Sequence, residues 1–251
     1  MKNVIIFDDA FYIPQLDRER KIWVYLPPGY ESSNRHYPVL YMHDGQNLFD
    51  NTTSYVGEWG IDEIMNKMIE DGFPGIIIVG IEHGSEERLN EYSPWKHQKM
   101  GGGLGDKHIA FLVETLKPAI DKNFRTLPDR ENTGIGGSSM GGLISCYAML
   151  KHPEIFSRGI IFSPAFWFSE ESYKYAENIE INNELRMYFL AGGKEYGDLN
   201  VIEATKKMID ILRAKGLSEN QYHFKTDPKG KHTEAFWSKY FAEAVRFLFV
   251  G

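Results

Sequence analysis

The five residues Gly137-Ser138-Ser139-Met140-Gly141 constrain the fold of this 251-residue chain more than any others. They match the pattern G-x-S-x-G with Ser139 at its centre, and the surrounding sequence gives that pattern its meaning. Residues 132–136 are typical of a short strand, and residues 142–150 are typical of a helix. A strand, a sharp turn and a helix together present a serine hydroxyl to substrate, with free amides and the positive helix end behind it.

Strand patterns and helix patterns alternate along the rest of the chain. Strand-like segments are 22–26, 39–42, 75–81, 159–162, 187–191 and 222–225, and helix-like segments are 61–69, 109–124, 201–212 and 234–250. This alternation predicts an α/β fold with a mainly parallel central sheet and helices on both faces. The first strands follow one another without a helix, which predicts antiparallel pairing at the N-terminal edge. Pro118 is expected to kink or split its helix.

The chain is expected to form one domain over residues 1–251, because its length suits a single α/β core and no linker divides it. Residues 82–106 fit no regular element and include the glycine-rich run 101–105. Those glycines do not spell a nucleotide-binding loop. A long loop in a compact domain is often a lid over a binding site, so a lid is one interpretation and a flexible surface loop is the other.

The formal net charge of -7 argues against nucleic acid or an anionic membrane as the main partner. The single cysteine, Cys146, allows no internal disulfide, and no cluster of Cys and His has metal-ligand spacing. The residues therefore give no sign of a metal site. The apolar run near the N-terminus is too short for a signal peptide, which predicts a cytoplasmic protein unless a signal has been trimmed.

A serine hydroxyl needs a base to take its proton, and at neutral pH histidine is the usual base. In sheets of this type the base follows the serine in the chain and lies after a late strand. His232 stands there, directly before the last helix, whereas His152 ends a helix and His223 lies within a strand pattern. We therefore predict that His232 is the base.

An acid that orients the histidine should follow the preceding strand. The segment after that strand runs Gly192-Gly193-Lys194-Glu195-Tyr196-Gly197-Asp198. Glu195 is the preferred acid, and Asp198 stays open as its competitor.

An oxyanion hole needs backbone N–H groups aimed at the developing negative charge. The amide of Met140, directly after the nucleophile, is the first candidate. The second is the amide of Gln46, in the loop after the strand at 39–42. Asp44 and Asn47 in that loop can be explained by ordinary turn chemistry, which is the preferred explanation for Asp44.

Several large side chains are candidates for the wall of a substrate pocket. Trp167 follows a strand end, where parallel sheets bind ligands. Trp59 can be pocket or core, and Tyr92 and Arg88 in the segment 82–106 are weaker candidates. Trp237 on the last helix is expected in the core.

Taken together, these motifs resemble the putative-esterase family of α/β-hydrolases. The resemblance rests on HDGQNLFD at 43–50, GEWG at 57–60, EYSP at 91–94, IGGSSMGG at 135–142, SPAFW at 163–167, and on Lys231, His232 and Trp237. That family includes enterochelin esterases and carbohydrate esterases of the feruloyl and acetylxylan type. The resemblance implies an α/β-hydrolase fold and a Ser139–His232 pair with an acidic third member. It also implies that no metal or cofactor takes part, and Glu195 matches the family's glycine-then-acid pattern.

The sequence therefore predicts a serine hydrolase of carboxylic esters that works through an acyl-enzyme. The expected substrate is a small-molecule or oligosaccharide ester, either an acylated sugar (feruloyl or acetyl) or a siderophore ester. Two alternatives stay open. An acyltransferase would pass the same acyl group to an alcohol, and a binding protein of the same fold would have no activity.

Overall fold

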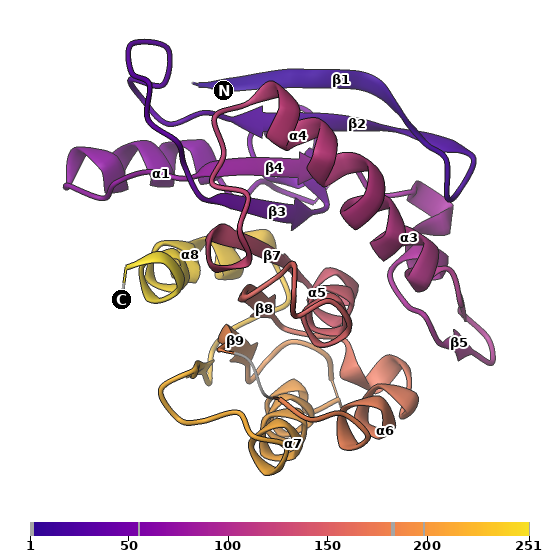
Figure 1. Cartoon of the computed structure of the whole chain (residues 1–251). Coiled ribbons are helices and arrows are strands. Elements are labelled where there is room, and N and C mark those ends of the chain that lie inside the picture. The colour runs from indigo at the N-terminus through magenta and orange to yellow at the C-terminus, as the bar shows by residue number, and fades with distance from the viewer. Residues whose placement is uncertain (1–2, 55, 182–183, 198, 251) are drawn as a thin grey trace.

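A mixed β-sheet runs through the middle of the computed structural model, which describes residues 3–54, 56–181, 184–197 and 199–250 (Figure 1). In that part of the chain the sheet has eight strands in the order β1-β2-β4-β3-β7-β8-β9-β10. The strands are β1 (Val4–Ile13), β2 (Arg18–Tyr25), β3 (Val39–His43), β4 (Ile77–Ile81), β7 (Thr133–Ser138), β8 (Arg158–Phe162), β9 (Arg186–Gly192) and β10 (Tyr222–Asp227).

The pairing confirms the predicted sheet. Strands β4, β3, β7, β8, β9 and β10 pair in parallel with their neighbours, whereas β1 pairs antiparallel with β2, and β2 with β4. Strands β3, β4 and β7 are buried along their whole length, as expected for strands covered on both faces. Because the central strands are parallel, their carboxyl ends meet at one edge, where a ligand site is expected.

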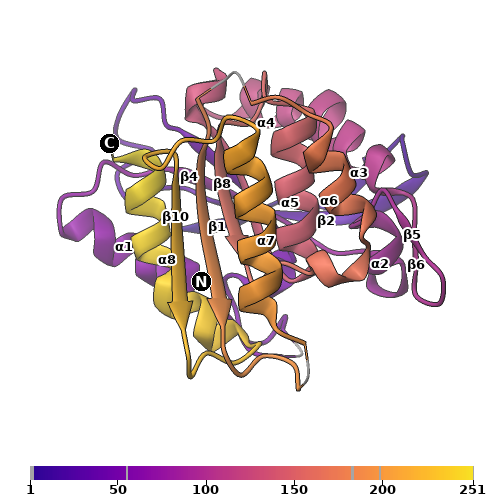
Figure 2. The same ribbon diagram turned by 90° about the horizontal axis from the view of Figure 1, so that it is seen from below.

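Helices cover both faces of this sheet (Figures 1 and 2). On one face lie α1 (Ile61–Glu70) and α8 (Glu234–Phe249), and on the other α3 (Gly105–Phe111), α4 (Lys117–Asn123), α5 (Met140–Lys151), α6 (Glu171–Glu177) and α7 (Val201–Ala214). Each face has its own apolar core. Trp59, Phe162 and Phe241 belong to the first, and Tyr41, Leu143 and Phe189 to the second.

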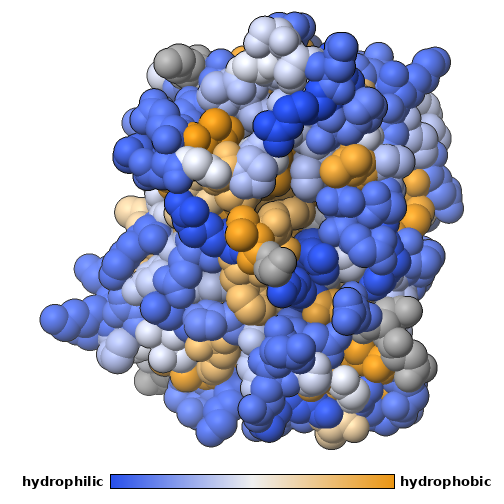
Figure 3. Space-filling model, turned by 60° about the vertical axis from the view of Figure 1, so that its left-hand side comes forward, coloured by the Kyte–Doolittle hydropathy of each residue, from blue (hydrophilic) through white to orange (hydrophobic). Residues whose placement is uncertain are grey.

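Hydrophilic residues cover most of the face shown in Figure 3, and hydrophobic residues appear there only in small groups. Most of the buried hydrophobic side chains lie in the two cores. Within the described residues, no helix is long and apolar enough to span a membrane.

Residues 82–106 are more ordered than the sequence predicts. They hold the short elements η2 (Ser85–Glu87), α2 (Arg88–Glu91), β5 (Lys96–His97) and β6 (Gly101–Gly102), and then the start of α3. Glu91 is buried within this segment and accepts hydrogen bonds from Arg18 and Arg20 of β2 at 2.6 and 2.5 Å. Elements of two to four residues show no periodicity, so the sequence pattern could not reveal them. The role of this segment as a lid stays a prediction.

Pro118 does not break its helix. Between α3 and α4 the chain forms a π-helical turn, η3 (Leu112–Leu116), and Pro118 follows in the first turn of α4. A proline lacks an N–H and crowds the carbonyl four residues earlier, and a wider turn relieves that crowding. The helical segment is therefore interrupted by a π-helical turn before Pro118 and is not split by a loop; a kink at Pro118 stays a prediction.

Candidate active site

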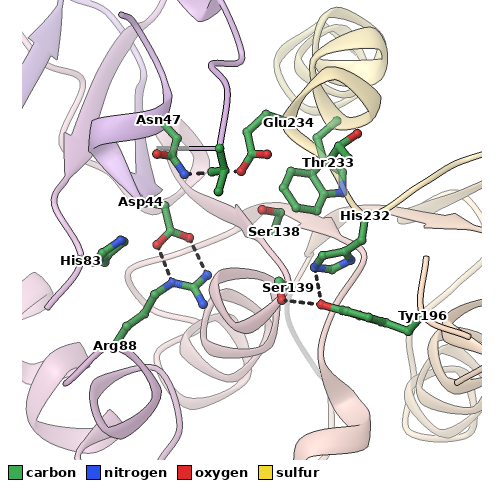
Figure 4. Close-up of a pocket in the computed structure, with 12 residues that line it drawn as sticks. Asp44, Asn47, His83, Arg88, Ser138, Ser139, Tyr196, His232, Thr233 and Glu234 are labelled. Carbon is green, nitrogen blue, oxygen red and sulfur yellow. Dashed lines mark hydrogen bonds and ion pairs between the residues drawn. The ribbon is translucent and has the colours of Figure 1, made fainter. Parts of the chain in front are cut away.

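A cavity of about 560 Å³ opens at the carboxyl ends of the parallel strands. Figure 4 shows that the side chains around it come from distant parts of the chain. They are Asp44, Asn47, Val56, His83, Arg88, Ser138, Ser139, Tyr196, His232, Thr233, Glu234 and Trp237. Ser139 and His232, two of the three predicted catalytic residues, both line this cavity.

Ser139 lies in the sharp turn between β7 and α5. Its backbone has φ 59° and ψ -122°, which is strained for a residue with a side chain. The turn is held on both sides: the Ser139 amide donates to the Phe162 carbonyl at 2.9 Å, and the Ser139 carbonyl accepts from the Ala165 amide at 3.0 Å. A Cβ atom on Gly137 would lie 3.0 Å from the Gly141 backbone, so glycine lets the two arms of the turn approach.

His232 and Glu195 form a hydrogen-bonded pair beside the serine. His232 Nδ1 lies 2.8 Å from Glu195 Oε2, and the Glu195 side chain is fully buried. A carboxylate only accepts, so Nδ1–H is the donor and Nε2 carries the lone pair. In this tautomer the lone pair of Nε2 is the proton acceptor of the ring, and Nε2 is the nitrogen on the cavity side.

The carboxylate of Glu195 is itself held by neighbours from two other segments. Its Oε1 accepts from Ser163 Oγ at 2.7 Å and also from the Gly192 amide. Ser163 Oγ in turn accepts from Trp237 Nε1 at 2.8 Å. Trp237 therefore reaches the imidazole through a chain of three hydrogen bonds that begins on α8.

The two predicted oxyanion donors both lie in a first helical turn, where an amide has no intrahelical acceptor. Met140 opens α5, and Gln46 lies in the short helix η1 (Gly45–Asn47) after β3. A Cβ atom on Gly45 would lie 2.6 Å from the backbone of Gly80 and Ile81, so glycine lets η1 pack directly on β4. Thr53 Oγ1 and the His83 amide donate to Gln46 and hold it further.

Asp44 does more than the ordinary turn chemistry that the sequence favours. It has φ 57°, as in a turn, but its carboxylate also pairs with both Nε and Nη2 of Arg88 at 2.7 and 2.8 Å. Burial favours a neutral carboxyl, but the guanidinium outweighs burial and holds the pKa of Asp44 below its ordinary value. The pair places Arg88 in the cavity wall with its charge balanced.

Glu234 also lines the cavity, from the start of α8 (Figure 4). Burial, with a smaller effect from Asp44, raises the pKa of this carboxyl to about 7. Asn47 Nδ2 donates to Glu234 Oε1 at 3.4 Å. Because it faces the cavity, this carboxyl can accept from or donate to a substrate hydroxyl near neutral pH.

Tyr196 occupies the space between the serine and the histidine (Figure 4). Its phenolic oxygen is 2.5 Å from His232 Nε2 and 3.5 Å from Ser139 Oγ. A single oxygen atom therefore lies between the predicted nucleophile and the predicted base.

Two of the candidate pocket residues, Trp59 and Tyr92, do not line this cavity. Trp59 is in the core. Its ring stacks on Phe162 at 5.7 Å and also contacts the rings of Trp237 and Phe241 on α8. Tyr92 is also fully buried, and its hydroxyl accepts from the Asp44 amide at 3.3 Å. It supports the cavity loop from behind.

Trp167 is half-buried and packs edge-on against the Tyr196 ring at 6.0 Å. It therefore borders Tyr196 and does not line the cavity itself. Asp198, the alternative acid, lies outside the described residues.

Sequence reasoning missed Tyr196, Ser163, Glu234 and the pocket role of Trp237. Glu234 stands two residues after His232, and Tyr196 directly after Glu195, so adjacency to predicted catalytic residues was the available signal. Ser163 has φ 43°, and a Ser-Pro sequence after a strand does not predict that backbone conformation. In the described part of the chain, no group of three His, Cys, Asp or Glu side chains could hold a metal ion.

A family model described as "Putative esterase" matches residues 13–248. The uncharacterized protein YbbA of Bacillus subtilis (strain 168) is 27% identical over 245 residues, and the alignment covers 92% of each chain. A solved ferulic acid esterase superposes with a TM-score of 0.74 at 18% identity over 98% of each chain.

The enterobactin esterase FES from Shigella flexneri, solved in the presence of enterobactin, has a TM-score of 0.75 at 17% identity. That superposition covers 98% of this chain and 58% of the other. At such identities the structural matches show that the fold is shared.

Proposed function

The chain belongs to the putative esterase family and is a carboxylic ester hydrolase of α/β-hydrolase fold, and from this premise we propose that Ser139, His232 and Glu195 are its catalytic triad. The observation that carries the proposal is the arrangement at the strand ends. Ser139 lies in a strained turn at the cavity, and His232 is held by the buried Glu195 with Nε2 directed to the serine side.

The proposed reaction begins when Ser139 Oγ attacks the ester carbonyl carbon and His232 Nε2 takes the serine proton. The amides of Met140 and Gln46 stabilise the oxyanion that forms on the carbonyl oxygen. His232 then gives its proton to the leaving alcohol, and the acyl group stays on Ser139. A water molecule, deprotonated by His232, releases the acid and restores the serine.

The substrate is an acylated sugar or a siderophore ester, and the charges in the cavity favour the acylated sugar. An iron–catecholate complex is an anion and calls for excess positive charge. Arg88 is instead balanced by Asp44, and Glu234 adds a carboxyl that can become negative. Asn47, Glu234 and His83 are suited to hydrogen bonds with neutral hydroxyl groups.

The proposal is tested with a panel of acetyl, butyryl and feruloyl esters and a catecholate lactone, run with the wild-type protein and with Ser139→Ala. We expect turnover that depends on Ser139, with the feruloyl or acetyl sugar ester preferred. Ester turnover that persists in Ser139→Ala contradicts the triad. Product analysis with added alcohols would reveal acyl transfer in place of hydrolysis.

A further inference from the structure

The hydroxyl of Tyr196 is hydrogen-bonded to the atom that must accept the serine proton. The ring of Tyr196 lies against the imidazole of His232, with 4.2 Å between centroids, and its edge meets Trp167. Its oxygen is 2.5 Å from His232 Nε2. The aromatic ring and the hydroxyl are therefore both fixed on the catalytic histidine.

The direction of this hydrogen bond follows from the rest of the site. His232 Nδ1–H donates to Glu195, so Nε2 has a lone pair and can only accept. Burial raises the pKa of Tyr196, so the phenol keeps its proton and donates. A ring nitrogen has one lone pair in the ring plane. While the Tyr196 hydroxyl donates a hydrogen bond to this lone pair, the Ser139 hydroxyl cannot donate to it.

A proton relay through the phenol would be the other way to interpret this contact. In a relay the Ser139 proton would pass to the phenolic oxygen while the phenol gives its own proton to His232. That transfer needs a short bond from Ser139 to the phenol. The distance is 3.5 Å, at the outer limit of a hydrogen bond, whereas the bond to His232 is 2.5 Å. The geometry favours blocking over relay.

The phenolic oxygen also occupies the place of a reaction partner. In the proposed mechanism His232 Nε2 must come within about 3 Å of the leaving oxygen in order to protonate it. The Tyr196 oxygen is already at that distance. An ester and the Tyr196 hydroxyl therefore compete for one position.

We propose that Tyr196 is the gate of this active site: its hydroxyl holds the leaving-group position in the free enzyme and must swing away before an ester is cleaved. The proposal rests on the proposed triad. If a ligand binds only to an open state, its apparent affinity is reduced in proportion to the fraction of molecules that are open. The gate therefore raises KM for every ester by one common factor and leaves kcat unchanged at saturation.

The test compares the wild-type protein with Tyr196→Phe, which keeps the ring and removes the hydroxyl. The matched control is Tyr12→Phe, since Tyr12 is exposed on β1 and its hydroxyl bonds only Asp17 among the described contacts. The measurements are kcat and KM for a small acetyl ester and a larger feruloyl ester. The rate at which a fluorophosphonate labels Ser139 is measured in parallel.

For Tyr196→Phe we expect kcat/KM to rise about three- to tenfold on both esters, the effect of losing roughly one net hydrogen bond. Labelling should accelerate by the same factor, with kcat within about twofold of wild type. Tyr196→Ala should label at least as fast, and it carries the test if the phenylalanine variant is poorly folded. Tyr12→Phe should match wild type throughout.

The gate would be overturned if the Tyr196 variants had a rate of Ser139 labelling and a kcat/KM no higher than those of the wild-type protein. A fall in kcat of tenfold or more with KM unchanged would overturn it in favour of a relay. Failure of the triad itself would look different. Neither wild type nor any Tyr196 variant would then label at position 139, and Ser139→Ala would keep its esterase activity.

Discussion

At the scale of single residues, the chemistry depends on which atom holds the proton of Ser139. The strained turn presents the hydroxyl but does not activate it. Activation requires an imidazole in one tautomer, and the hydrogen bond from His232 Nδ1 to Glu195 selects that tautomer. The buried carboxylate of Glu195 would also stabilise the imidazolium that forms when the serine attacks.

Replacing the carboxylate of Glu195 by an amide tests its effect on the imidazole. Glu195→Gln keeps the size of the side chain but can present an N–H to His232, which favours the wrong tautomer. We expect kcat to fall by about 10²- to 10⁴-fold with little change in KM, as when the acid of such a triad becomes an amide. Steady-state kinetics measure it, with Asp198→Asn as the matched control. A large loss in Asp198→Asn and a small one in Glu195→Gln would make Asp198 the acid.

At the scale of elements, the site is assembled where strand ends meet the starts of helices. Ser139 lies between β7 and α5, Ser163 follows β8, and Glu195 follows β9. Trp237 on α8 joins these loops through Ser163. The orientation of the His232 imidazole therefore depends on how α8 packs on the sheet.

A double-mutant cycle tests this link between α8 and the strand ends. Ser163→Ala removes a donor to Glu195 and leaves the buried Trp237 N–H without its acceptor. We expect a loss of about 1–3 kcal/mol in the free energy of unfolding and a kcat roughly tenfold lower. Adding Trp237→Phe removes the orphaned N–H, so the double variant should lose less stability than the two single losses added together. If the losses in free energy of unfolding, measured in urea, are strictly additive, the two residues do not interact.

Sequence patterns predicted these elements well wherever burial is regular. The buried strands β3, β4 and β7 and the long helices carry continuous or periodic apolar residues. Strand β1 and the seven-residue α6 were not predicted, because the edge strand β1 is mostly exposed and a short helix shows little periodicity.

The site was predictable only in part, and for a similar reason. Ser139, His232 and Glu195 stand at positions that the order of strands and helices singles out. Tyr196 and Ser163 reach the site through contacts between loops that are 30 or more residues apart, such as Ser163 with Glu195. No local pattern encodes those contacts. They follow only once the parallel strands bring their carboxyl ends together.

At the scale of the whole molecule, Glu234 couples the cavity to the stability of the fold. Its carboxyl has a pKa of about 7 in the folded protein, above the ordinary value of 4.5, because folding buries it. Between those two pH values the folded state therefore binds more protons than the unfolded state. The stability contributed by this carboxyl is complete below about pH 4.5 and is lost as the pH rises through about 7.

The corresponding prediction is that Glu234→Gln, which cannot ionise, gains stability relative to wild type as the pH rises from 5 to 8. Urea unfolding at the two pH values measures the difference, with the exposed Glu177→Gln as the control. A relative stability of Glu234→Gln that stays constant or declines over this range would show that folding does not raise the pKa of Glu234.

We propose that Ser139 forms a covalent acyl-enzyme with the help of His232. The most direct measurement is peptide mapping by mass spectrometry after reaction with a fluorophosphonate, in wild type, Ser139→Ala and His232→Ala. We expect one modified residue, Ser139, with no label in Ser139→Ala and labelling slowed by several orders of magnitude in His232→Ala. Modification of another residue, or equally fast labelling without His232, would contradict it.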